Sequence, residues 1–361
     1  MSRALWGKQE MIEKIKKIQE KYQSENLLFT DRKETFYLCN ADFDGFWLAV
    51  RKDEIFAVCS KMVENQVSEF FEKAALPVKV VAKTPLSDSV AEIFGEKGEK
   101  TLLTDANLVS AANFIVLQQK LAGKQVKLTA KTGILDSLRL VKTQKEIENI
   151  RISCKIISKI CDTVKKELKP GISELGIHFR IMELLAQNKV KESFTPIVAA
   201  GANSANPHHA SSNYKLREND AVMIDLGCFY NGYASDLTRT FYLGKISGKF
   251  KTIWDIVKDS QSAVLKEIKA GLPLSWADKT ARQVLEKAGY VDKFLHTTGH
   301  GLGIEIHEMP SLGANAEGFF LTNMAVTVEP GVYLNGEFGV RIEDTIIITE
   351  KGCEVLTSAE Y

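Results

Sequence analysis

The N-terminal third of the chain alternates between the apolar spacing of helices and that of strands. A one-faced helix is expected over Lys8–Gln23, where apolar residues recur at helical spacing. The same spacing returns over Lys61–Ala75 and Ser87–Phe94. Short apolar runs predict strands at Asn26–Thr30, Gly45–Val50, Ile55–Cys59, Val78–Ala82 and Thr101–Thr104, with a hairpin around Arg51–Glu54. These elements predict an α/β domain, and none of them carries a chemical motif.

A change of pattern separates this domain from the rest of the chain. The sequence is irregular over Lys124–Leu140, and a long helix follows. Thr143 and Glu146 have the spacing of a capping box, and we expect the helix that they begin to run to about Leu168. The boundary predicts a smaller N-terminal domain at residues 1–132 and a larger domain at residues 138–361.

The larger domain contains a long internal repeat. Each copy has a helix, a Pro- and Gly-containing turn and a second helix, and the turns lie at Lys169–Ser173 and Lys269–Ser275. The first copy's second helix extends to about Gln187, and the second copy runs from Thr252 to about Gly289.

Strand-like segments recur in the two copies. Asn219–Asp225 lies 104 positions before Asn323–Glu329, and each leads into a hairpin at an Asn-Gly turn, Asn231-Gly232 and Asn335-Gly336. A repeat of this length predicts two fused α/β halves with a site in the cleft between them.

Composition narrows the class of protein. The 361 residues are 45% hydrophobic and 26% charged, as in soluble globular proteins, and 47 basic against 46 acidic residues leave a net charge of +1. No field favours nucleic acid or an anionic membrane, and we read no signal peptide and no apolar stretch of membrane-spanning length. Six scattered cysteines without a CxxC pair indicate a reducing compartment, with the cytoplasm as the default.

Four acidic residues lie in the two predicted hairpins: Asp225, Asp236, Glu329 and Glu343. Counted outward from each turn, the members of each pair lie nearly opposite each other, so all four could converge among apolar neighbours. Buried carboxylates repel one another and cost several kcal/mol each. Arg239 and Arg341 could pair with only two of them. A pair of divalent metals bridged by carboxylates is the counter-charge that fits.

Five of the six histidines lie in two short segments, which suits a site that needs an imidazole ligand: His208, His209, His296, His300 and His307. Only His178 lies elsewhere. Glycines at Gly299, Gly301 and Gly303 allow the backbone to approach the site closely.

These segments resemble the pita-bread metallopeptidases, and within them the Xaa-Pro branch of prolidase and aminopeptidase P. The resemblance rests on Asp225 in IDLGCFYNGYASDLTRTF, His300 in GHGLGIEIHE, Glu329 in TVEPGVY and Glu343 in GVRIED, and it spans about Leu138–Thr357. The N-terminal domain resembles, more weakly, the creatinase-type N-terminal domain. The resemblance implies a two-domain α/β protein whose C-terminal pita-bread domain has two pseudo-symmetric halves.

The resemblance also implies a role for each matching residue. Asp236 and Glu343 would bridge two metals, Asp225 would complete one metal's ligand set, and His300 and Glu329 would complete the other's. The remaining matches are to groups near the substrate: His208 and His307 as catalytic histidines, His296 as a pocket residue, and Arg341 as a partner of the ligands or of the substrate carboxylate. His209 is expected to be a structural neighbour.

The implied reaction is hydrolysis of the bond between an N-terminal residue and proline. Oxygen-rich ligands suit Mn(II), with Co(II), Zn(II) or Fe(II) as alternatives. A metal-bridging hydroxide would attack the carbonyl, Glu329 would move the proton, and the two catalytic histidines would stabilise the oxyanion. The partner is then a peptide with proline at its second position, and a homodimer is expected because the N-terminal domain has no catalytic candidate of its own.

Several alternatives stay open at this point. The sequence is compatible both with a dipeptidase, which cleaves Xaa-Pro dipeptides, and with an aminopeptidase, which cleaves longer peptides. A metal-free amidinohydrolase like creatinase would have no use for the buried carboxylates. A pita-bread protein with another N-terminal specificity, or a non-catalytic peptide-binding module, is the remaining alternative.

Overall fold

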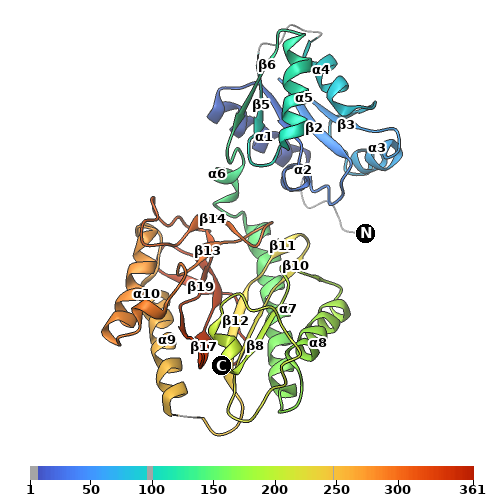
Figure 1. Ribbon diagram of the computed structural model, residues 1–361. Helices are drawn as coiled ribbons and strands as arrows, with labels where there is room; N and C mark the ends of the chain where they lie inside the picture. Colours follow the sequence, from blue (N-terminus) through green and yellow to red (C-terminus); the bar gives the residue numbers. More distant parts are fainter. Residues whose placement is uncertain (1–6, 96–100, 247) are drawn as a thin grey trace. The chain divides into compact units, whose positions relative to one another are not determined.

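The structure, a computed structural model, describes residues 7–95, 101–246 and 248–361. The chain divides into two compact units, Met1–Leu138 and Arg139–Tyr361, which are described separately (Figure 1).

The N-terminal unit is built on a six-stranded mixed sheet with the order β4-β3-β2-β1-β5-β6. Its strands are β1 (Asn26–Phe29), β2 (Phe46–Arg51), β3 (Glu54–Cys59), β4 (Val78–Ala82), β5 (Thr101–Asp105) and β6 (Lys127–Lys131). The five predicted strands are confirmed, and so is the hairpin, in which Arg51 pairs with Glu54. Strand β1 is antiparallel to β2 and parallel to β5.

The N-terminal unit's helices are α1 (Lys8–Tyr22), α2 (Arg32–Cys39), α3 (Glu64–Lys73), α4 (Leu86–Gly95) and α5 (Ala111–Ala122), and α6 (Asp136–Arg139) lies at the division between the units. Helices α1, α3 and α4 were expected, whereas α2 and α5 were not. Helix α2 begins with a capping box formed by Asp31 and Glu34, a signal that is visible in the sequence.

The division between the units falls within Lys124–Leu140, where the sequence pattern is irregular, and the structure places β6 and α6 in this stretch, neither of which was expected. Strand β6 pairs only with β5 and buries only Leu128 of its five residues. An edge strand with mostly exposed side chains has no apolar alternation to reveal it.

The C-terminal unit places its strands between two pairs of helices, α7 and α8 on one side and α9 and α10 on the other (Figure 1). The helices are α7 (Gln144–Glu167), α8 (Glu174–Gln187), α9 (Gly248–Glu267) and α10 (Ser275–Lys287), with 3₁₀ turns η1 (Gly201–Ala205) and η2 (Val291–Lys293). The predicted capping box is confirmed at Thr143 and Glu146. None of the helices in the described ranges is long and apolar enough to cross a bilayer.

The strands of the C-terminal unit form several small sheets. The first half contains β7 (Lys191–Glu192), β8 (Ile197–Ala200), β9 (Ala221–Leu226), β10 (Cys228–Tyr230), β11 (Tyr233–Ala234) and β12 (Leu237–Tyr242), in the orders β12-β9-β8 and β11-β10-β7. The second half contains β13 (His300–Gly301), β14 (Glu308–Ser311), β15 (Ala325–Val328), β16 (Gly331–Leu334), β17 (Phe338–Arg341), β18 (Asp344–Ile348) and β19 (Cys353–Val355), in the orders β14-β13-β15-β18-β19 and β16-β17.

The backbone repeats the same local geometry in both halves. Asn219 and Asn323, which precede β9 and β15, both adopt left-handed conformations, with φ of 68° and 70°. Both Asn-Gly turns close hairpins: Tyr230 pairs with Tyr233, and Leu334 pairs with Phe338. Strands β9 and β15 are buried along their whole length, so acidic residues at their ends are held within the core.

Candidate metal centre

The four predicted carboxylates lie at the ends of the central strands of the two halves. Asp225 is in β9, Asp236 directly precedes β12, Glu329 directly follows β15, and Glu343 directly precedes β18. Three of them are nearly inaccessible, with exposed fractions of 8% for Asp225, 5% for Asp236 and 2% for Glu343. The strands therefore hold the carboxylates in the interior, as the apolar neighbours had indicated.

The strand register differs between the two carboxylate pairs. Val328 pairs with Asp344, so Glu329 and Glu343 stand opposite each other one position further along the same register. Asp225 instead pairs with Thr238, which places Asp236 diagonally from it. The expectation that both pairs lie nearly opposite thus holds for the second pair, whereas the first pair is diagonal.

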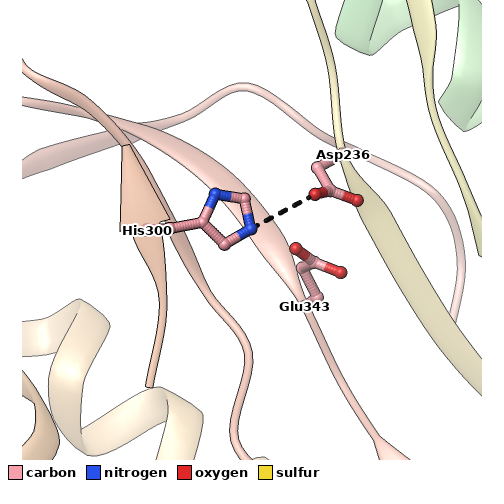
Figure 2. Close-up of side chains that lie close together, drawn as sticks. All are labelled: Asp236, His300 and Glu343. Atoms are coloured by element: carbon pink, nitrogen blue, oxygen red, sulfur yellow. Dashed lines mark ion pairs between the residues drawn. The ribbon is translucent and has the colours of Figure 1, made fainter. Parts of the chain in front are cut away.

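His300, on β13, faces these carboxylates (Figure 2). Its Nε2 lies 3.5 Å from Asp236 Oδ2 and 3.4 Å from Glu329 Oε1. Its Nδ1 lies 3.1 Å from the carbonyl oxygen of Gly301, which can only accept, so Nδ1 carries the proton. Burial lowers the pKa of His300, which favours the neutral ring. The unprotonated Nε2 then points its lone pair at carboxylate oxygens. This arrangement favours a cation between the ring and the carboxylates.

The residues present fit divalent metal ions. Asp236, His300 and Glu343 offer ligand atoms that lie within 4.8 Å of one another. Within the described part of the chain, Asp225 Oδ1, Asp236 Oδ1 and Glu343 Oε1 are buried without a hydrogen-bond partner. Buried oxygens without donors are costly, and a metal ion removes this cost by coordinating them.

The carboxylates also perturb one another. Burial raises the pKa of Asp225 and of Glu329 above the ordinary range. Burial together with repulsion from the neighbouring carboxylates raises the pKa of Asp236 and of Glu343 well above it. Four anionic groups at this spacing need positive charge to stay ionised at neutral pH.

Only one of the two candidate arginines contacts a carboxylate of the site, and its charge lowers the pKa of all four carboxylates. Arg341 Nη2 lies 2.6 Å from Asp225 Oδ2, and its Nε donates to Thr238 Oγ1 at 3.0 Å. Thr238 in turn donates to Glu343 Oε2 at 2.6 Å. Arg239 pairs with a different carboxylate, Asp344, at 2.8 Å. Pairing of the site's acids with both arginines is therefore excluded, because among the described residues only Asp225 of these four acids has an arginine partner.

His296 lies at the edge of the site in a chain of hydrogen bonds. Its Nδ1 lies 2.8 Å from the carbonyl oxygen of Thr297, and its Nε2 lies 2.8 Å from the hydroxyl of Tyr333. Arg341 Nη1 donates to the same hydroxyl at 3.0 Å. Since a carbonyl only accepts, His296 carries its proton on Nδ1, and the Tyr333 hydroxyl donates to Nε2. Burial raises the pKa of Tyr333 to about 12, so this hydroxyl keeps its proton.

The other predicted histidines differ in exposure. His208 and His307 are exposed, and the His307 ring lies 4.4 Å from the His300 ring, centroid to centroid. Partial desolvation of its ring lowers the pKa of His307, the neighbouring imidazoles of His300 and His208 also lower it, and the carboxylates of Glu329 and Asp225 raise it. His209 does not face this group: its Nε2 lies 2.8 Å from Glu174, a fully buried carboxylate, in agreement with the structural role expected for it.

Sequence reasoning missed the residues that orient the ligands. Tyr333 lies in the quoted segment TVEPGVY, four positions after Glu329, but nothing in the sequence indicates that it contacts Arg341. Thr238 and Thr327 were also missed, and Thr327 Oγ1 donates to Glu329 Oε1 at 3.0 Å. Away from the ligands, Glu174 follows a helix N-cap and gives no local sign of the five hydrogen bonds that its carboxylate accepts.

Two family models match the chain, one in each of its two units. Residues 148–350 match Metallopeptidase family M24, and residues 11–141 match the Creatinase/Prolidase N-terminal domain. An Xaa-Pro dipeptidase from Pyrococcus furiosus is 31% identical over 354 residues, covering 97% of this chain and 98% of that protein.

Solved structures agree with this comparison. The Xaa-Pro dipeptidase from Bacillus anthracis superposes with a TM-score of 0.92 at 30% identity, covering 98% of both chains. The X-Pro aminopeptidase from Thermotoga maritima gives a TM-score of 0.87 at 25% identity, covering 95% of this chain and 98% of that one. The expected fold, a smaller N-terminal α/β domain followed by a two-halved pita-bread domain, is confirmed.

Proposed function

The chain belongs to metallopeptidase family M24, and from that membership we propose that it is a dinuclear-metal exopeptidase that cleaves the bond between an N-terminal residue and proline. The observation that carries the proposal is the convergence of His300 Nε2 with Asp236 and Glu329, beside three buried carboxylate oxygens that have no donor among the described residues, Asp225 Oδ1, Asp236 Oδ1 and Glu343 Oε1. Relatives named Xaa-Pro dipeptidase and prolidase, matched over nearly their whole length, support the substrate class. We propose that the N-terminal domain comprises residues 1–132 and the catalytic domain residues 138–361.

Five residues would hold the metals. We propose that Asp236 and Glu343 bridge two ions, that Asp225 binds one, and that His300 and Glu329 bind the other. Divalent metal dependence follows from the family, and the oxygen-rich ligands favour Mn(II), with Co(II), Zn(II) and Fe(II) as alternatives. When bound, the ions supply Lewis acidity and lower the pKa of a coordinated water towards neutrality.

Glu329 is the group that would transfer the proton. Glu329 receives a hydrogen bond from Thr327 on one oxygen, while its other oxygen lies 4.0 Å from His296 Nδ1. Placed beside the attacking water, Glu329 would take a proton from it and give that proton to the departing proline nitrogen.

The histidines and Arg341 would position the substrate. Donors aimed at the developing oxyanion typically contribute a few kcal/mol, and the exposed rings of His208 and His307 are free to approach a bound carbonyl. His296 would line the pocket for the substrate. Arg341, whose guanidinium contacts Asp225, Thr238 and Tyr333, would act chiefly by holding Asp225 in place.

Two further proposals concern the state of the protein. We infer a homodimer, because the N-terminal unit contributes no catalytic candidate, and light scattering after size-exclusion chromatography tests it; a single monomeric mass would exclude it. We also infer a cytoplasmic location, because the cysteines are free and five of the six are buried, as is typical of proteins kept in a reducing compartment.

The activity is tested with an Xaa-Pro dipeptide and a longer Xaa-Pro-Xaa peptide, each offered to metal-free protein with and without added Mn(II). Cleavage of the dipeptide alone assigns a dipeptidase, and cleavage of the longer peptide assigns an aminopeptidase. Ala-Ala-Ala serves as the matched substrate without proline. Its preferred cleavage would indicate another N-terminal specificity, and no cleavage by the metal-loaded protein would contradict the proposal and favour a peptide-binding role.

A further inference from the structure

A buried cluster of charges lies directly beside His307. The carboxylate of Glu308 accepts from Arg139 Nη2 at 2.7 Å and from Lys142 Nζ at 3.1 Å. Arg139 also donates to Glu305 Oε2 at 2.7 Å, and the backbone amide of Glu305 donates to Glu308 Oε1 at 3.0 Å. The Glu308 and Lys142 side chains are only 4% and 2% exposed, so solvent screens this pair weakly.

The cluster is balanced in charge, and a backbone hydrogen bond anchors it at Lys142. Two cations, Arg139 and Lys142, face two carboxylates, Glu305 and Glu308. Burial alone would raise the pKa of Glu308, but the charges of Lys142 and Arg139 hold it below the ordinary value. The backbone amide of Lys142 donates to the carbonyl of Asn323 at 2.9 Å, which anchors the cations just ahead of β15.

The segment from Gly301 to Glu308 is shaped around this carboxylate. A Cβ added to Gly303 would come within 2.7 Å of both Glu308 oxygens, so only glycine leaves room for them. Glu308 begins β14 and pairs with Gly301, next to a register shift between His300 and Gly301. The glycine spacing of GHGLGIEIHE is therefore explained in part by the cluster and not by the metal ligands alone.

We propose that Glu308 is a positioning residue, which together with Arg139 and Lys142 fixes the backbone that presents His307 to the substrate. His307 is exposed and its ring packs against that of His300, so its own side chain has little to hold it. The buried ion pairs of the next residue along the chain fix its Cα. A displacement of about 1 Å at such a group can cost ~10²-fold in rate. This inference rests on the proposed peptidase function for its kinetic readout.

Three variants test it. Lys142→Met keeps the Arg139–Glu308 pair and removes one cation, whereas Glu308→Gln removes the carboxylate charge at constant shape. Arg151→Gln is the matched control, because Arg151 also joins two glutamates, Glu148 and Glu354, and contacts no site residue. We expect Lys142→Met to lower kcat by ~10-fold and Glu308→Gln by ~10²-fold, with KM and metal content near wild type. The control should change kcat by less than about 2-fold.

A double-mutant cycle separates positioning from a general structural effect. In a His307→Ala background, Lys142→Met should cost less than about 2-fold more, because the group it positions is already gone. If the kcat losses of Lys142→Met and His307→Ala multiply in the double variant, the proposal is overturned. The cycle uses Lys142→Met, the milder variant, so the test does not depend on the folding of Glu308→Gln.

A second readout does not need catalysis. In histidine side-chain NMR of the Zn(II)-loaded full chain, Lys142→Met should shift or broaden the His307 signals, assigned with His307→Gln, and leave those of His178 unchanged. If the wild type cleaves no peptide, the proposed function fails and this spectrum still tests the positioning role. An unchanged His307 signal in Lys142→Met would overturn it.

Discussion

Replacing Asp236 with Asn should have opposite effects on the metal-free and the metal-loaded protein. Asp236 is 5% exposed, and the charges of Glu343, Asp225 and Glu329 raise its pKa, in addition to the effect of burial. Its Oδ1 has no hydrogen-bond partner among the described residues. Asn has the same shape without the charge, so the variant removes repulsion and leaves the packing intact.

The size of the effect follows from the burial. Each unit by which burial and repulsion raise a carboxylate's pKa corresponds to about 1.4 kcal/mol, so we expect the neutral Asn to stabilise the metal-free protein by on the order of 1–4 kcal/mol. In a unit the size of Arg139–Tyr361, about 1 kcal/mol corresponds to roughly 2–4 °C in unfolding temperature. We therefore expect metal-free Asp236→Asn to unfold at a temperature about 2–16 °C higher than metal-free wild type.

Metal should reverse this order. Two Mn(II) ions, each at about 100 times its Kd, stabilise the wild type by ~2.7 kcal/mol apiece, which exceeds the metal-free difference, whereas the variant lacks one proposed bridging ligand and should gain much less. Xaa-Pro hydrolysis should be lost in the variant at every Mn(II) concentration, because the two-ion site is incomplete.

Scanning calorimetry in EDTA and in Mn(II) measures both effects. Asp255→Asn is the control, because Asp255 is an exposed residue of α9 whose partner is Lys251, and its change should stay within about 0.5 kcal/mol in both conditions. A metal-free Asp236→Asn less stable than wild type would refute the repulsion argument. An equal response of variant and wild type to Mn(II) would refute the bridging role.

Four further predictions concern separate parts of the molecule. Tyr333→Phe removes the hydroxyl that links Arg341 to the histidine at the edge of the site, and we expect kcat/KM to fall ~10-fold with metal content unchanged; an unaffected kcat/KM would contradict this. Burial raises the pKa of Glu34 to about 8, so its contribution to stability is complete at low pH and is lost as pH rises towards 8. Glu34→Gln should therefore show a smaller fall in the unfolding temperature of the N-terminal unit between pH 5 and 8 than wild type, and parallel curves would contradict the assignment. Gly303→Ala should reduce kcat, because its methyl group displaces the Glu308 carboxylate, whereas Gly352→Ala, between β18 and β19, should leave kcat near wild type, because an added Cβ there has no neighbour within 4 Å and the backbone is not left-handed. Chelation should abolish hydrolysis, and Mn(II) should restore it; activity that survives complete metal removal would contradict the dinuclear mechanism.

Much of the fold was predictable because its signals are local. Apolar spacing located α1, β2 and β3, and the capping box of Thr143 and Glu146 located the start of α7. The 104-residue offset between β9 and β15 predicted two similar halves, and the matching left-handed Asn219 and Asn323 agree with it. Apolar spacing, a capping box and each copy of the repeat are all recognised from residues within a few positions of one another, so one sequence is enough to find them.

The pairing of charges was not predictable in the same way. Arg239 and Arg341 were equal candidates as partners of the site's carboxylates in the sequence, but the structure gives Arg239 to Asp344 and only Arg341 to Asp225. The contacts of Glu308 with Arg139 and Lys142 join residues more than 160 positions apart. Strand β6 was missed because it is an exposed edge.

The sequence by itself thus determined which residue types are available: four carboxylates, an imidazole and flexible glycines at fixed intervals along two similar halves. The tertiary structure alone decided which of them lose their counter-charges, which oxygens remain without donors, and which buried ion pairs hold the His307 segment. The physical reason is that periodicity records burial, which is a local property of each position. The energy of a charge depends instead on what lies within a few ångströms of it, and that is fixed only when distant strands pack together.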